Sequence, residues 1–117
     1  MVEYPFFPES ELNACSPPCS TEDMDERFMN TLVELRLAFG KSMPLTCAYR
    51  SPQYDKRKGR GGGSTHTLGL AVDTHVTDAE ALELICLARM MGFTGVGVQQ
   101  AGPRSTRFVH LDMAPPG

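Results

Sequence analysis

The ten-residue segment 64–73 constrains this chain more than any other part of its sequence. It reads Ser-Thr-His-Thr-Leu-Gly-Leu-Ala-Val-Asp, which separates a histidine, His66, from a carboxylate, Asp73, by six residues. Gly69 lets the backbone turn between them without the penalty that a β-carbon would impose. Together with the distant His110, the two side chains form a three-ligand set suited to zinc. Three protein ligands leave a fourth position for water, as in catalytic rather than structural zinc sites.

Two stretches of alternating polarity are predicted to be strands that carry these ligands. Residues 70–76 alternate over the end of the motif, so His75 is expected to share a face with the carboxylate ligand. Residues 107–113 also alternate, which sets His110 and Asp112 on one face and the apolar residues between them on the other. The two strands would each present a ligand to a common cleft.

The segment 64–73 resembles the first metal motif, Ser-x-His-x-x-Gly-x-Ala-x-Asp, of the zinc D-Ala-D-Ala carboxypeptidase family, whose fold is shared with the hedgehog signalling domain. Residues 46–52, Thr-Cys-Ala-Tyr-Arg-Ser-Pro, are similar to the family's strand that ends in Tyr-Arg-Ser. Residues 108–112, Phe-Val-His-Leu-Asp, are similar to its closing strand with the third ligand. The resemblance covers nearly the whole chain and implies a single-domain phage or bacterial member.

The resemblance also implies a fold and an activity. The fold is α+β, of the hedgehog/DD-peptidase type, with a small, mainly antiparallel sheet, helices packed on it and a zinc cleft on its open face. The activity is hydrolysis of peptidoglycan stem peptides or cross-links that contain D-amino acids, by a lysin or a wall-remodelling enzyme. Bound Zn²⁺ would lower the pKa of its water and polarise the scissile carbonyl.

Three further residues are candidates for substrate binding. Arg50 is expected to hold a carboxylate of the peptide, for which its guanidinium fork is suited. Ser64 would hydrogen-bond the metal carboxylate or cap a turn. His75 is expected not to bind the metal; it would contact the substrate, hydrogen-bond a ligand from behind, or simply end the strand.

The general base is open at this point. Many members of the family carry a carboxylate three residues before the last histidine ligand, where this chain has Arg107. Asp112 is the replacement that the sequence favours, because it lies two residues from His110 on the same strand face. Asp112 could instead orient His110 or Arg50. A zinc-binding module without catalysis, or a structural phage component of the same fold, therefore stays as an alternative function.

Length and charge bound the remaining possibilities. The 117 residues predict one domain, 1–117, with an irregular N-terminal arm over 1–20. The net charge of −3 argues against a general nucleic-acid partner, and no apolar stretch approaches the ~20 residues of a membrane span. Because no basic-then-apolar signal segment opens the chain, we expect a protein of the host cytoplasm before release, or a virion-associated one, that acts on the cell wall. The oligomeric state is open, with a monomer favoured.

Periodicity and turn residues predict the other elements, and the four cysteines are predicted not to form a disulfide framework. The expected elements are a helix over 23–39 that Gly40 ends, a strand over 44–49, a polar loop over 51–63, a mostly buried helix from a capping box at 77–80 to about residue 91, a strand over 94–98 and a turn over 99–106. In the arm, Phe6, Phe7 and Leu12 are expected to pack on the core. Cys47 and Cys86 are predicted to be buried free thiols, and Cys15 and Cys19 to be reduced thiols, with a second metal site as the minority alternative.

Overall fold

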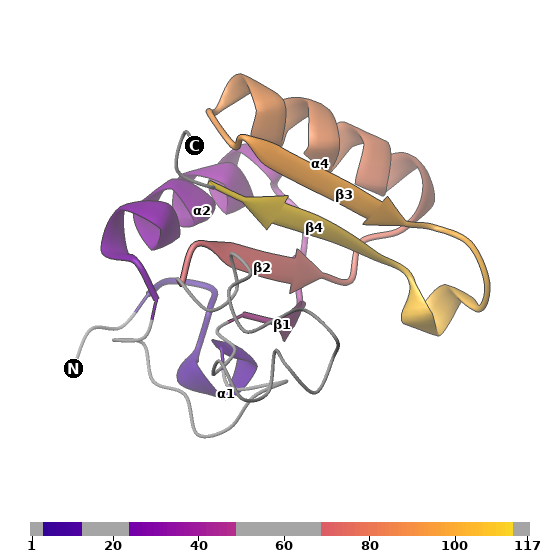
Figure 1. Cartoon of the computed structure of the whole chain (residues 1–117), viewed down its shortest axis with the longest axis horizontal. Helices are drawn as coiled ribbons and strands as arrows, with labels where there is room; N and C mark the ends of the chain where they lie inside the picture. The colour runs from indigo at the N-terminus through magenta and orange to yellow at the C-terminus, as the bar shows by residue number, and fades with distance from the viewer. Residues whose placement is uncertain (1–3, 13–23, 49–68, 114–117) are drawn as a thin grey trace, which may run out of the picture.

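The computed structural model of the chain describes residues 4–12, 24–48 and 69–113 (Figure 1). Within these ranges four strands form one antiparallel sheet in the order β1-β2-β4-β3. The strands are β1 (Leu45–Cys47), β2 (Ala71–Thr74), β3 (Gly95–Gln99) and β4 (Phe108–Asp112). The helices are α1 (Glu9–Leu12), α2 (Glu26–Phe39), α4 (Asp78–Met90) and the short 3₁₀ helix η3 (Arg104–Thr106). No helix in the described ranges is long and apolar enough to cross a bilayer.

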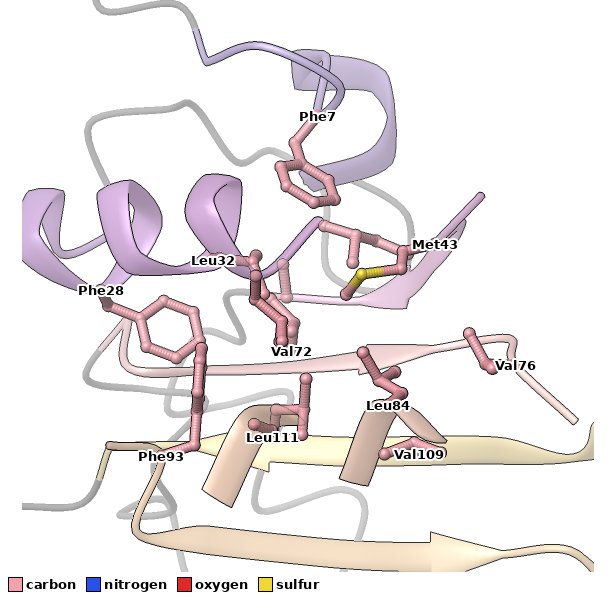
Figure 2. Close-up of a cluster of buried hydrophobic side chains, with 14 of the residues drawn as sticks. Phe7, Phe28, Leu32, Met43, Val72, Val76, Leu84, Phe93, Val109 and Leu111 are labelled. Carbon is pink, nitrogen blue, oxygen red and sulfur yellow. The ribbon is translucent and has the colours of Figure 1, made fainter. Parts of the chain in front are cut away.

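The two long helices cover one face of the sheet. Figure 2 shows Leu32 of α2 and Leu84 of α4 pointing toward Val72 of β2 and Leu111 of β4. Along β4, the residues Val109 and Leu111 are fully buried while their neighbours keep some exposure. Since successive strand side chains point to opposite faces, the polar side chains of β4 lie on the face turned away from α2 and α4. The predicted alternation of this strand is therefore confirmed.

Helix α2 supplies the largest share of the core, as its three- and four-residue spacing predicted. The four residues at that spacing are all buried: Phe28, Leu32, Leu35 and Phe39. Full burial of one such side chain stabilises the fold by about 1.5–3 kcal/mol.

Both ends of α2 are capped. The carboxylate of Asp25 accepts a hydrogen bond from the backbone N–H of Phe28 at 2.8 Å. At the other end Gly40 adopts the left-handed conformation, with φ 69°, and its N–H bonds to the carbonyl of Arg36. The structure thus confirms Gly40 as the terminator and begins the helix at Glu26, later than residue 23.

Helix α4 begins at Asp78, close to the predicted position, but the predicted capping box is wrong. Thr77 makes no capping hydrogen bond through its side chain. The backbone N–H of Asp78 donates instead to the side-chain oxygen of Gln100, at 3.0 Å. A side chain 22 residues away thus satisfies a helix-end donor that local sequence was expected to satisfy.

The predicted burial of α4 on most sides is also wrong. Ala81, Leu84 and Ala88 face the core, but Leu82 and Met90 are 65% and 83% exposed. The helix lies over one face of the sheet, and only one stripe of its surface is covered. It therefore carries more apolar side chains than the sheet can bury.

Two cysteine predictions are wrong as well. Cys47 in β1 is disulfide-bonded, with a partner outside the described residues, and Cys86 in α4 is a free but exposed thiol. Cys47 is nonetheless buried, as predicted. Disulfides are typical of proteins that mature in or reach oxidising surroundings.

The N-terminal arm follows the prediction in part. Phe7 and Leu12 are buried in the core, whereas Phe6 is exposed and its ring lies under the guanidinium of Arg36. Its described part also includes the four-residue helix α1, which packs near β1 and which the sequence did not indicate. The polar loop predicted over 51–63 lies outside the described residues.

Candidate metal centre

The centre of the site is a carboxylate and an imidazole that face each other across two strands. In the antiparallel pairing of β2 with β4, Asp73 lies directly opposite His110. Opposed residues of this kind bring their β-carbons to about 4.5–5.5 Å, close enough for the side chains to meet. Oδ1 of Asp73 and Nδ1 of His110 are 2.9 Å apart. The two predicted strands therefore bring these two predicted ligands together.

A second carboxylate lies on the other nitrogen of the same ring. Oδ2 of Asp112 accepts a hydrogen bond from Nε2 of His110 at 2.7 Å. All three side chains are largely buried, and Asp73 as a whole residue is only 7% exposed. Burial lowers the pKa of His110, but the hydrogen bonds and negative charges of the two carboxylates outweigh it and raise that pKa above its usual 6.5.

Two glycines of β3 give these side chains their room, and the sequence reasoning missed both. Gly95 pairs with Asp112 and Gly97 pairs with His110. A β-carbon at Gly95 would overlap the Asp112 carboxylate, whereas one at Gly97 would lie 3.5 Å from the β-carbon of His110, an ordinary contact. Glycine inside a strand often marks such a close approach. The Gly-Val-Gly pattern in the predicted strand over 94–98 was the signal that could have revealed them.

The donor atoms present fit part of a zinc shell. Zinc binds histidine nitrogen and carboxylate oxygen at about 2.0–2.2 Å in tetrahedral geometry, which separates two ligand atoms by about 3.3–3.5 Å. The 2.9 Å between Asp73 and His110 is near this separation and becomes suitable with a small side-chain shift. Among residues 4–12, 24–48 and 69–113 no group of three or more potential ligands is arranged for a metal. The predicted third ligand, His66, lies outside those ranges.

His75 and Arg107 belong to a network at the end of β2. Nδ1–H of His75 donates to the backbone carbonyl of Arg107 at 2.8 Å. The Arg107 guanidinium pairs with Asp78 at 3.0 Å and donates to the carbonyl of Gly102. Arg107 therefore fastens the turn before β4 to the start of α4. Arg107 thus has a structural use in this fold.

The other predicted substrate residues have no described position. Arg50 and Ser64 lie outside the described residues, so their placement at the site stays a prediction. The role of His75 is also untested, although its ring is fixed by a backbone carbonyl.

A carboxylate and an imidazole, partly buried and paired across strands of an α+β domain, supply two donor types that zinc accepts. A sequence model of the family described as Peptidase M15 matches residues 7–112. The chain therefore belongs to the peptidase M15 family, whose members are generally zinc-dependent, and this membership indicates a metallopeptidase. No curated protein matches the chain.

Proposed function

We propose that this protein is a zinc metallopeptidase that hydrolyses peptide bonds of peptidoglycan stem peptides or cross-links. The observation that supports the proposal most directly is the pair formed by Asp73 and His110, with 2.9 Å between their donor atoms. The pair combines two of the three predicted ligands, and the family match indicates the peptidase chemistry to which such a site belongs. The proposal adds zinc as the metal and the bacterial cell wall as the substrate.

Each residue of the site has a part in this proposal. His66 completes the ligand set with Asp73 and His110, and bound zinc would supply a water of lowered pKa together with polarisation of the scissile carbonyl. Arg50 binds a carboxylate of the peptide, because its guanidinium offers paired donors to a planar anion. Ser64 and His75 are the remaining proposed contacts around the substrate.

The strand β3 supports access to this centre. Gly97 lies beside His110 and carries no side chain, so the sheet surface there is low next to the proposed ligand. The site lies on the sheet face turned away from α2 and α4. Among the described residues, position 97 of β3 therefore places no side chain over His110.

The experiment combines metal analysis with wall digestion on one preparation. We expect wild-type protein to hold one zinc per chain and to release new amino groups from purified peptidoglycan. Asp73→Asn, which keeps the size of the side chain but removes a charged ligand, should lose the zinc and the activity together. Glu83→Gln is the matched control, since Glu83 lies on an exposed part of α4 and pairs there with Lys41. Wild-type protein without stoichiometric zinc would refute the proposal.

A non-catalytic zinc module of the same fold is the second candidate. It is favoured by Arg107, which is engaged by Asp78 and Gly102 at the position where many relatives carry a carboxylate. One zinc per chain with no amine release from any wall type would establish this alternative. For either function we propose a monomer that reaches the wall after release from the host cytoplasm or as part of a virion.

A further inference from the structure

We infer that Asp112 is a positioning residue: it holds Nε2–H of His110 and thereby fixes the ring with Nδ1 available to the metal. The inference rests on the proposed function and goes beyond it, because the sequence favoured Asp112 as the proton acceptor of the reaction. The 2.7 Å hydrogen bond between Asp112 and Nε2 of His110 is its first support.

The orientation of the His110 ring is the second support. Its Nδ1 edge faces β2, where Asp73 lies 2.9 Å away. Its Nε2 bonds to the carboxylate of Asp112, and that carboxylate lies against Gly95 of β3, in the volume that a β-carbon there would take. The ligand Asp73 and the carboxylate of Asp112 are therefore on opposite edges of one imidazole.

This separation distinguishes the two roles considered for Asp112. A general base must come within hydrogen-bond reach of the proton that it removes. Asp73 and Nδ1 of His110 are the atoms that would hold a metal, whereas Asp112 bonds to the other ring nitrogen, Nε2. A carboxylate on the far nitrogen of a ligating histidine sets the tautomer and raises the ligand's basicity.

The packing around Asp112 is the third support, since small neighbours leave space for the carboxylate beside Nε2 of His110. Asp112 pairs with Ala71 on one side and Gly95 on the other, so neither neighbour has a long side chain. The carboxylate lies over Gly95, in the volume that a β-carbon there would take. In this position the Asp112 side chain is only 13% exposed and bonds to Nε2 of His110.

Zinc affinity of four variants tests the inference, measured by competition with a chromophoric chelator. Asp112→Ala should weaken zinc binding about 10- to 100-fold, the usual effect of removing such a partner. Asp112→Asn keeps an oxygen that can accept a hydrogen bond from Nε2–H, so its zinc affinity should fall only a few-fold. Gly95→Ala should resemble Asp112→Ala, because the added methyl displaces the carboxylate. Gly97→Ala is the matched control and should bind zinc like wild type, since its methyl makes only ordinary contacts.

Nitrogen NMR of the His110 ring gives a readout that does not depend on activity. Zinc-loaded wild type should show a protonated Nε2 and a metal-bound Nδ1. Asp112→Ala should lose the slowly exchanging proton on Nε2. This readout does not need Gly95→Ala, so it holds even if that variant fails to fold. Asp112→Ala with wild-type zinc affinity and no turnover would overturn the inference and favour the base role. A metal on Nε2 would overturn it as well. Wild type that binds no zinc would refute the proposed function itself, which is a distinct result.

Discussion

The ring of Phe93 meets the ring of Phe28 edge to face, with centroids 5.7 Å apart and planes at 80°. Both side chains are fully buried, and the contact joins α2 to the segment that leads from α4 into β3 (Figure 2). Aromatic pairs favour this geometry because the positive edge of one ring faces the negative face of the other. The pair thus fixes a helix to the strand that carries the two site glycines.

Phe28→Ala should lower the free energy of unfolding by about 3–5 kcal/mol, because the truncation leaves a cavity in addition to the lost burial. Leu37→Ala on the same helix is the control: Leu37 is exposed, and its truncation should change stability by no more than about 0.5 kcal/mol. Urea denaturation followed by circular dichroism measures both. Equal stability losses in the two variants would contradict the packing described for α2.

Gln100 should matter far more than its neighbour Gln99. The Gln100 amide donates to the carbonyls of Val76 and Phe108 and accepts from the N–H of Asp78. Gln100→Ala leaves the two partly buried carbonyls and the exposed N–H without that partner and should cost about 1–3 kcal/mol. Gln99→Ala removes one exposed bond of 3.4 Å, to Ala101, and should be close to neutral. Thermal unfolding of the pair checks this, and a neutral Gln100→Ala would show that the amide is dispensable.

Removal of metal should destabilise the protein if the proposed site holds zinc. A ligand that binds only the folded state adds about 2.7 kcal/mol when its free concentration is 100 times its Kd. We expect a chelator to lower the Tm of wild type and to leave the Tm of Asp73→Asn unchanged. A chelator-induced drop of equal size in both proteins would place the stabilising metal elsewhere.

The metal-free protein should lose stability as the pH rises through the folded-state pKa of His110. The two carboxylates raise that pKa above 6.5, so protonation of His110 favours the folded state. This contribution is fully present below the unfolded pKa and disappears once the folded pKa is passed. Chelator-treated wild type should therefore show a larger fall in Tm above neutral pH than His110→Asn does. If the Tm of the two proteins changed with pH in the same way, a protonated His110 in the metal-free fold would be ruled out.

The sequence predicted the elements whose signals are local. The spacing of Phe28, Leu32 and Leu35 is satisfied within α2, and Gly40 ends that helix through its own left-handed backbone. The alternation of polar and apolar residues around His110 predicted that this segment is a strand and which face of the strand carries His110. In each case the neighbours that determine the structure lie within a few residues along the chain.

The features that escaped prediction depend on distant residues. The cap of α4 comes from Gln100, the bond of Cys47 involves another cysteine, and the partner of Gly95 is Asp112 on a neighbouring strand. The role of Asp112 also needed the structure, because its hydrogen bond to Nε2 rather than an approach to the Nδ1 side depends on ring orientation. The spacing of two residues along a strand predicts that their side chains share a face of the sheet. It does not predict how those side chains are oriented on that face.

The carboxylate of Asp112 lies where a side chain at position 95 would have to be, so substitutions at these two positions depend on each other. A chain that gains a side chain at 95 cannot keep the carboxylate at 112 in its present place. Substitutions are therefore permitted in one order: position 112 must shorten before position 95 can grow. Across related sequences, a chain with a side chain at position 95 should lack the carboxylate at position 112, whereas a chain that has lost the carboxylate can still carry glycine at position 95.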